Sequence, residues 1–297
     1  MLTIKDKIIL SPLWFLTLFP LRILYGFSFL AYCLVYHVAG YRKKVVYTNL
    51  KNSFPEKTEH EIKKIQKGFY HWLCDYFFES MYILNMRRKE SMKRYNVVNP
   101  EVIDDLHAKN KNFVLYGIHY GNWEWSNIFP LSIKHEIYVA YQKLKNKTLN
   151  RLFITLRSKY GVKTVSMKKI YRTAIRCIDE KKQFCLYLLA DQRPGMESLD
   201  YWTTFLNQET PIITGPEKIA RRFNMATVFM ETIRKKKGMY DIVFHVLNEN
   251  PQETREFEIT QKFADKLEEM IKQNPEMYLW SHKRWKFKKE DFVTIDS

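Results

Sequence analysis

The stretch Asn112-Phe-Val-Leu-Tyr-Gly-Ile-His119-Tyr-Gly-Asn-Trp-Glu124-Trp decides the fold. Residues 113–118 form a short apolar run with β-branched and aromatic side chains, which is typical of a buried strand. The run ends at His119, a Gly-Asn pair breaks it, and helical spacing resumes at residue 123. The pattern predicts a strand, a tight turn that carries His119, and a helix whose first turn holds Glu124. Open α/β sheets bind ligands where strands end, so this turn is the first candidate site.

The chemistry of the turn follows from its two titratable residues. A neutral imidazole can accept a proton from a hydroxyl group, and a nearby carboxylate can fix its tautomer and stabilise the imidazolium. We therefore predict that His119 is a general base and that Glu124 orients it. No serine or cysteine stands beside them and the chain has no Gly-x-Ser-x-Gly motif, so the nucleophile would be a hydroxyl of the substrate. The alternative is a purely structural role, in which the histidine and the glutamate only cap the turn.

A second candidate site follows another apolar run. Residues 184–190 predict a strand, and Asp191-Gln-Arg-Pro-Gly195 comes directly after it. If the two strands are neighbours in one sheet, Asp191 and Gln192 face the same crevice as His119. Alternatively, Asp191 caps its turn and Arg193 is solvated. Arg157 has a planar guanidinium suited to an anionic substrate group, although an exposed helical arginine has the same appearance in a sequence.

Strands and helices are predicted to alternate from residue 97 onward, which indicates an α/β fold with a mixed, partly parallel sheet flanked by helices. Thr58-Glu-His-Glu61 fits a capping box that begins a long helix reaching residue 86, with an apolar stripe that includes Phe77. The predicted helices after it cover residues 100–109, 145–160, 170–180, 215–223 and 256–273, and the predicted strands cover residues 137–141, 162–166, 226–233 and 240–247, the last two as a hairpin.

The N-terminal segment differs from this pattern. Between residues 8 and 39 only Arg22 is permanently charged. As a helix, residues 23–39 would span about 25 Å, slightly less than the roughly 30 Å hydrocarbon core. Pro20 and Arg22 make a kinked or shallow helix an alternative to a straight span, and a buried core helix is a third reading. Arg42 and its neighbours follow directly, which favours a cytoplasmic body. We expect a membrane anchor at residues 1–40 and a catalytic domain at residues 41–297.

The net charge and the cysteine content limit which partners the protein can have. The net charge of +17 indicates an anionic partner, namely nucleic acid, an acidic protein or an anionic membrane surface. The basic and aromatic residues 283–289 would suit single-stranded nucleic acid or anionic lipid. The apolar N-terminal segment favours lipid, so no nucleic-acid partner is expected. The four cysteines lack paired spacing and zinc spacing, which indicates reduced thiols, an intracellular chain and no metal.

Several motifs together resemble the lipid A late acyltransferases, the lauroyl/myristoyl acyltransferase family of Gram-negative bacteria. The matching segments are Asn49-Leu-Lys-Asn-Ser-Phe-Pro55, the H-x4-(D/E) motif from His119 to Glu124, Asp191-Gln192, Thr214-Gly215, and Pro275-Glu-Met-Tyr-Leu-Trp-Ser-His-Lys-Arg-Trp285. The resemblance covers nearly the whole chain. The related glycerolipid acyltransferases share the histidine motif, but their F-P-E-G-T-R phosphate segment has no counterpart here, which argues against a glycerol-phosphate acceptor.

The resemblance implies an acyltransferase without a cofactor, at the cytoplasmic side of the bacterial inner membrane. Acyl carrier protein would supply the fatty acyl chain, and a lipid A precursor would accept it on a hydroxyl group. His119 and Glu124 would be catalytic. The residues expected to contact substrate are Asn122, Arg157, Asp191, Gln192 and Arg193, and the backbone amides of the Gly121-Asn122 turn are candidates for holding an oxyanion.

Two other functions stay open at this point. The same mechanism could act on another glycolipid or on an aminolipid. Outside enzymes, a membrane-attached nucleic-acid-binding or scaffold protein would also use the positive charge, and such a protein would be indifferent to His119→Ala.

Overall fold

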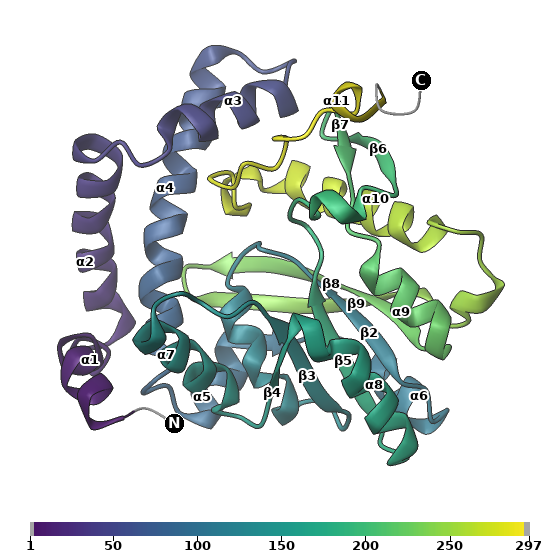
Figure 1. Cartoon of the computed structure of the whole chain (residues 1–297). Helices are drawn as coiled ribbons and strands as arrows, with labels where there is room; N and C mark the ends of the chain where they lie inside the picture. Colours follow the sequence, from purple (N-terminus) through teal and green to yellow (C-terminus); the bar gives the residue numbers. More distant parts are fainter. Residues whose placement is uncertain (1–2, 294–297) are drawn as a thin grey trace.

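A central seven-stranded sheet organises the chain. The computed structural model describes residues 3–293 (Figure 1). The strands of the sheet stand in the order β1-β9-β8-β2-β5-β3-β4. Their bounds are β1 (Tyr95–Val97), β2 (Phe113–Gly117), β3 (Glu136–Tyr141), β4 (Lys163–Ser166), β5 (Phe184–Leu189), β8 (Ala226–Lys236) and β9 (Met239–Asn248).

The sheet is mixed, as the sequence predicts. Strand β2 lies at its centre and pairs in parallel with β5 on one side and with β8 on the other. Strands β8 and β9 form the predicted antiparallel hairpin, while β3 and β4 extend the parallel part. Because β2 and β5 run in parallel and in register, with Gly117 opposite Leu189, their carboxyl ends meet at one edge of the sheet. The condition for a shared site is therefore met.

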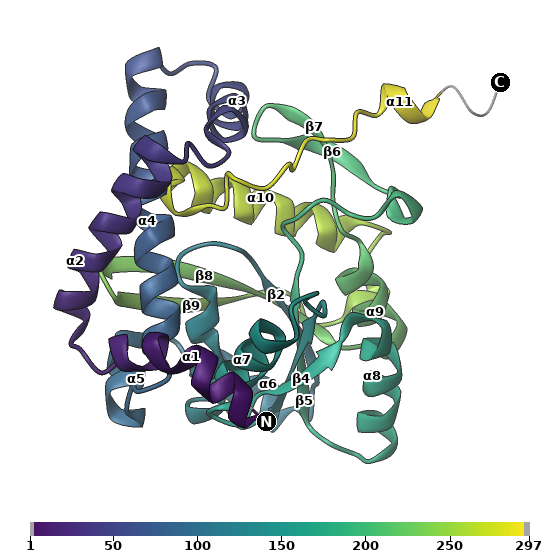
Figure 2. The ribbon, with the colours of Figure 1, turned by 60° about the vertical axis from the view of Figure 1, so that its left-hand side comes forward.

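Helices cover both faces of the sheet. Figure 2 shows the helices around the sheet. Alternate residues of β2 belong to two separate hydrophobic cores: Val114 and Tyr116 share one with residues of α8, α9 and α10, and Phe113 and Leu115 share the other with residues of α6, α7 and the 3-10 helix η2. Each such fully buried side chain stabilises the fold by roughly 1.5–3 kcal/mol. The bounds are α5 (Arg88–Arg94), α6 (Glu101–Ala108), η2 (Trp123–Leu131), α7 (Lys147–Ser158), α8 (Ile170–Asp179), α9 (Gly215–Phe223), α10 (Glu258–Gln273) and α11 (Glu290–Val293).

A small hairpin outside the main sheet was not predicted. It consists of β6 (Trp202–Phe205) and β7 (Gln208–Pro211). The connecting residues Leu206 and Asn207 both adopt left-handed backbone conformations, with φ of 50° and 59°. A two-residue hairpin turn of this type normally has the sequence Asn-Gly or Asp-Gly. The sequence Leu-Asn does not predict such a turn, because leucine rarely adopts a positive φ.

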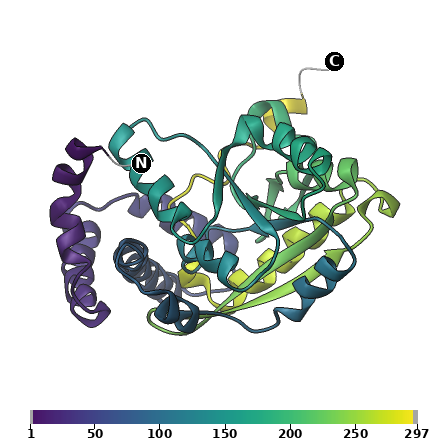
Figure 3. The same cartoon turned by 90° about the horizontal axis from the view of Figure 1, so that it is seen from below.

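The N-terminal segment folds as two helices rather than one. Helix α1 (Ile4–Leu16) is separated by a short break from α2 (Leu21–Tyr32), and α2 continues as a π-helical turn, η1 (Cys33–Val38). Helix α3 (Lys43–Ser53) follows, and then the long α4 (Glu59–Tyr82), whose capping box at Thr58 is present as predicted. Seen from below, α1 and α2 lie on the far side of α4 from the sheet (Figure 3).

Helix α2 combines a polar seam with an apolar outer surface. Its Tyr25 hydroxyl donates a hydrogen bond to Glu79 at 2.8 Å, and its Ser28 hydroxyl donates one to Asp75 at 2.6 Å. Both carboxylates belong to α4, so these bonds fasten the two helices together. The exposed large apolar side chains of α1 and α2 include Ile4, Ile8, Ile9, Trp14, Phe15, Ile23, Phe27, Phe29 and Leu30.

By length and composition alone, Leu21–Val38 is the one helix among the described residues that could cross a membrane. At 1.5 Å per residue it is about 27 Å long, close to the hydrocarbon thickness of a bilayer. Only 28% of this window is buried inside the protein, in contrast to a core helix.

Two smaller expectations have different outcomes. All four cysteines are free, and Cys74, Cys177 and Cys185 are buried, as expected for reduced thiols. The apolar stripe predicted for α4 is only partly core, because Phe77 is 49% exposed although Phe69 is fully buried. Helical spacing shows that these residues share one face of α4, but it does not show how much of that face the neighbouring helices cover.

Candidate active site

His119 lies just beyond the carboxyl end of β2, where the sheet brings a second strand end beside it. Gly117 of β2 accepts a hydrogen bond from the amide of Ala190 at 3.1 Å, which continues the β2–β5 pairing past the ends of both strands. A side chain at Gly117 would collide with the ring of Tyr187 at 2.1 Å, so only glycine allows this close approach. His119 and Asp191 consequently emerge side by side.

The turn after His119 is held from outside the sheet. Gly121 has a φ of 60°, and a Cβ atom there would lie 2.8 Å from the side chain of Thr232. Its amide donates a hydrogen bond to the carbonyl of Met277 at 3.1 Å, and Tyr120 forms a β-bridge with Tyr278. The segment that follows α10 therefore fixes the turn. The Gly121 amide, one of the candidate oxyanion donors in the Gly121-Asn122 turn, is thus already hydrogen-bonded.

The partner of His119 is Asp191. The Nδ1 atom of His119 lies 2.8 Å from Oδ1 of Asp191, and its Nε2 atom lies 3.3 Å from the side-chain amide nitrogen of Gln192. An amide N–H donates, so Nε2 is the acceptor and Nδ1 carries the proton that goes to Asp191. The His119 side chain is 16% exposed and that of Asp191 1% exposed. The imidazole thus presents its unprotonated nitrogen to the accessible side.

Electrostatics keep this carboxylate charged. Burial raises the pKa of Asp191, but its electrostatic interaction and hydrogen bonds with His119 outweigh burial, and the net pKa lies below its usual value. Nearby, burial lowers the pKa of His282 to about 4, so His282 is neutral at physiological pH. The Tyr278 hydroxyl donates to the backbone carbonyl of Asp191 at 3.2 Å, which fixes the Asp191 turn.

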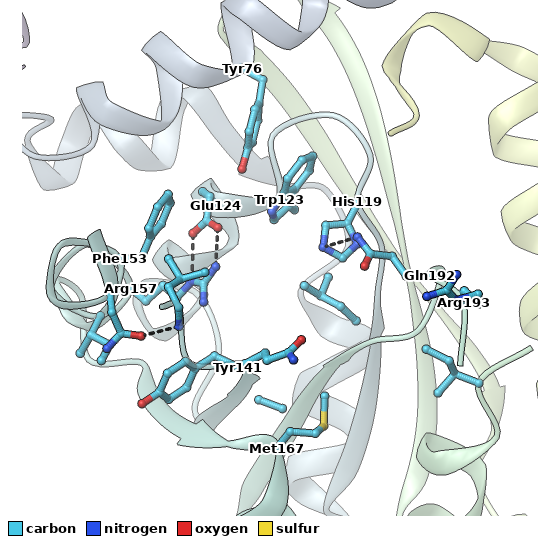
Figure 4. A pocket seen from close by; sticks show the side chains of 17 residues that line it. Tyr76, His119, Trp123, Glu124, Tyr141, Phe153, Arg157, Met167, Gln192 and Arg193 are labelled. Atoms are coloured by element: carbon cyan, nitrogen blue, oxygen red, sulfur yellow. Dashed lines mark hydrogen bonds and ion pairs between the residues drawn. The ribbon is translucent and has the colours of Figure 1, made fainter. Parts of the chain in front are cut away.

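Glu124 has a different partner from the one expected. Its two carboxylate oxygens accept hydrogen bonds from Nε and Nη2 of Arg157 at 3.0 and 2.5 Å. Among the hydrogen bonds of residues 3–293, none joins Glu124 to His119, so the pairing expected from their spacing is not made in this structure. The guanidinium fork occupies both oxygens at once, which is a strong charge-assisted arrangement. Trp123 lies between the Glu124 and His119 side chains (Figure 4).

Both pairs face one cavity of about 400 Å³. His119, Gln192 and Arg193 lie on one side of it, and Glu124 and Arg157 lie on the other (Figure 4). The rest of the wall is mainly apolar or aromatic and comes from α4, η2, β3, α7 and the β5 end. These lining residues include Tyr76, Trp123, Ala140, Leu144, Phe153, Ile154, Met167, Leu189 and Ile213.

The predicted substrate contacts divide into three groups. Arg157, Gln192 and Arg193 line the cavity, as expected of substrate contacts. Asp191 is buried behind His119 and does not line it. Asn122 is fully buried; its amide nitrogen donates to Glu79 at 3.0 Å and its side-chain oxygen accepts from the Trp125 amide at 3.3 Å. Its position is that of a cap for η2.

Sequence reasoning missed the aromatic wall. Trp123 stacks on Tyr76 with ring centroids 4.0 Å apart and meets the His119 ring edge-on at 5.0 Å. Tyr76 stands within the long α4 pattern, where an aromatic residue is most easily assigned to the core. The one available signal was Trp123 itself, an aromatic residue inside the turn motif.

The arrangement suits general-base chemistry on a hydroxyl group. A histidine with an ordered carboxylate behind it and an unprotonated Nε2 can accept a proton in an accessible, half-apolar cavity. No group of three histidine, cysteine or acidic side chains within the described part of the chain could hold a metal ion.

One comparison with known proteins identifies the family. The model of the bacterial lipid A biosynthesis acyltransferases matches residues 4–287 of the chain. No protein with curated annotation matches the sequence. Because the match covers nearly the whole chain, the protein belongs to the bacterial lipid A biosynthesis acyltransferase family, and it is an acyltransferase.

Proposed function

We propose that this acyltransferase moves a fatty acyl chain from the thioester of acyl carrier protein to a hydroxyl group of a lipid A precursor. We place the reaction at the cytoplasmic side of the bacterial inner membrane. The observation that carries the chemistry is the 2.8 Å contact of His119 Nδ1 with Asp191, which leaves Nε2 facing the cavity. The family match supports the acyl-transfer class and the type of acceptor.

In the proposed reaction, His119 Nε2 removes the proton of the acceptor hydroxyl as its oxygen attacks the thioester carbonyl. The imidazolium that forms is stabilised by Asp191. When the carbon–sulfur bond breaks, His119 returns the proton to the departing thiolate, which leaves an ester and a free thiol. General-base catalysis of this kind typically contributes 10²–10⁴-fold to the rate.

The remaining polar groups of the cavity have positioning roles in this proposal. Gln192 and Arg193 lie on the His119 side, where negative charge develops on the carbonyl oxygen, and hydrogen-bond donors there lower the barrier. The Glu124–Arg157 pair holds the opposite wall. Glu124 was predicted to orient His119, and Arg157 was predicted to contact substrate. Because they pair with each other, we assign both a role in shaping the cavity. The apolar wall around Phe153 and Ile154 would receive the acyl chain.

Membrane association fits the exposed apolar surface of α1 and α2. Acceptor and product both carry acyl chains, so a cavity next to a bilayer avoids moving those chains through water. The cluster of cations after α2, from Arg42 to Lys44, supports the cytoplasmic side.

The test is acyl transfer in detergent from acyl carrier protein to a tetra-acylated, phosphorylated disaccharide lipid. Wild type and His119→Ala are compared by mass spectrometry. We expect one added acyl group with wild type, and at least a 10³-fold slower reaction with the variant. Product from neither protein, with both folded, would direct the search to a mannoside or aminolipid acceptor. Equal product from both would eliminate His119 as the base.

A further inference from the structure

A second cavity lies apart from the active site, between the first turn of α2, helix α5 and the tip of the β8–β9 hairpin. Its volume is about 1200 Å³. Tyr82 of α4 lines it, whereas Tyr76 of the same helix lines the catalytic cavity. Six residues along an α-helix correspond to about 9 Å and to faces roughly 120° apart. The two cavities therefore lie on different faces of α4.

Cationic side chains dominate this second cavity. Five of its lining residues make no ion pair with any residue in the described range 3–293: Arg22, Arg87, Lys89, Lys93 and Lys236. These five unpaired cations line one groove together, and the groove contains a single carboxylate, that of Glu90. Their mutual repulsion destabilises the empty groove, and an anion would relieve it.

The single carboxylate of the groove does not compensate for them. Glu90 accepts a hydrogen bond from Arg94 Nε at 2.7 Å and another from the Tyr82 hydroxyl at 3.1 Å. Lys237, a further lining residue, pairs with Asp75 at 2.8 Å. The paired charges thus neutralise one another, and the five unpaired cations give the groove a net positive charge.

The groove is also amphipathic. Pro20, Leu21, Ile23 and Met239 contribute apolar surface to it. Ile23 is exposed and continues into Phe27 and Leu30, which belong to the apolar outer surface of α2. A ligand with a negatively charged head and apolar chains would match both parts, with the head among the cations and the chains along α2. An acidic protein would match the charge only.

We propose that this groove binds the phosphate headgroup of an anionic membrane phospholipid, separately from the substrates at His119. The proposal relies on the membrane association of α2 and is independent of the identity of the acyl acceptor. Each basic side chain near an anionic membrane surface contributes to attraction, and a concave cluster adds those contributions at one site. Bound lipid would hold α5 and the hairpin tip against the bilayer.

The experiment compares two triple variants of the full chain by vesicle flotation. The groove variant is Arg87→Gln/Lys89→Gln/Lys93→Gln. The matched control, Lys169→Gln/Arg172→Gln/Lys181→Gln, removes one arginine and two lysines that are exposed around α8. Each protein is offered phosphatidylcholine vesicles and phosphatidylcholine vesicles that contain phosphatidylglycerol. The ratio of the two affinities is the measured preference.

We expect the groove variant to lose at least tenfold of the wild-type preference for phosphatidylglycerol and the control variant to keep most of it. Binding to pure phosphatidylcholine and acyl transfer in neutral detergent should be unchanged in both, which also shows that the variants fold. Should the groove variant unfold, Lys236→Gln on the hairpin carries the same expectation, with about a threefold loss.

Three results would overturn the proposal. An equal loss in both triple variants would mean diffuse attraction by the whole basic surface. Displacement by sodium phosphate, but not by sodium chloride of equal ionic strength, would indicate a site for free phosphate. An unchanged lipid preference together with weaker binding of acyl carrier protein would assign the groove to the acidic protein instead.

Discussion

Two hydrogen-bonded side-chain pairs stand at the same cavity, and they are built differently. His119 and Asp191 come from two adjacent strand ends and share one hydrogen bond through Nδ1, while the unprotonated Nε2 accepts a 3.3 Å hydrogen bond from Gln192. Glu124 and Arg157 come from η2 and α7, and their double hydrogen bond uses both carboxylate oxygens. A group that exchanges a proton with substrate needs an atom that the substrate can reach. A carboxylate whose two oxygens both bind one guanidinium is better suited to stabilising the structure around it. From this difference we propose that Asp191 serves the reaction and that Glu124 shapes the cavity.

The largest expected effect is on Asp191. Asp191→Asn preserves the size of the side chain but removes the charge that stabilises the imidazolium and fixes its tautomer. We expect kcat for acyl transfer to fall by roughly 10³–10⁴-fold, with little change in thermal stability. Steady-state kinetics and a thermal melt on the same preparation measure both quantities. Activity close to wild type would remove the distinction between the two pairs.

Glu124→Gln should have the opposite profile. It leaves the Arg157 guanidinium, whose side chain is 20% exposed, without its counter-charge, which should lower the free energy of unfolding by roughly 3 kcal/mol. The double variant Glu124→Gln/Arg157→Gln removes both charges and should recover much of that loss. Denaturant titration of the single and double variants gives the coupling energy. If Glu124→Gln folds as stably as wild type yet is inactive, Glu124 is the catalytic carboxylate after all.

A smaller effect is expected where the His119 turn depends on its glycine. Gly121→Ala places a Cβ atom 2.8 Å from Thr232 and forces alanine to a φ of 60°. We expect a loss of about 1–2 kcal/mol in stability and a shift of His119 that lowers kcat more than it changes KM. Gly26→Ala is the matched control, since open space surrounds Gly26 within α2. Equal behaviour of the two variants would show that the turn tolerates a side chain.

At neutral pH the smallest effect concerns His282, whose contribution changes only as the pH falls. Burial lowers the pKa of His282 to about 4, so between pH 6.5 and 4 the unfolded chain binds a proton that the folded chain does not. Stability contributed by neutral His282 is therefore present above pH 6.5 and is lost as the pH falls toward 4. His282→Gln should make the melting temperature less sensitive to acid over this interval. An unchanged slope would mean that His282 titrates normally.

The sequence predicted the parts of the site better than their pairing. Apolar runs identify β2 and β5, and a parallel pairing of the two puts His119 beside Asp191. Nothing in a single sequence shows that these two strands are neighbours, so their contact stayed conditional. Glu124 was assigned to His119 because it is near in sequence, while its actual partner Arg157 lies 33 residues further on.

The fold shows the same division between local and long-range information. The bounds of α9 were predicted to the residue because a proline and a charged helical face mark them. The β6–β7 hairpin was missed because Leu206 takes a conformation that leucine rarely adopts. The local sequence was therefore sufficient to predict α9, and it was not sufficient to predict the β6–β7 hairpin.

The dependence of the His119 turn on the segment after α10 has a consequence for biosynthesis. On the ribosome, β2 and its histidine emerge well before Met277 and Tyr278, which hold Gly121 and Tyr120. Contacts so distant in sequence form late in folding. A nascent or prematurely terminated chain would therefore carry every element of the sheet and yet lack an aligned base. The turn that carries His119 would be held in place only after the segment that follows α10 has been made.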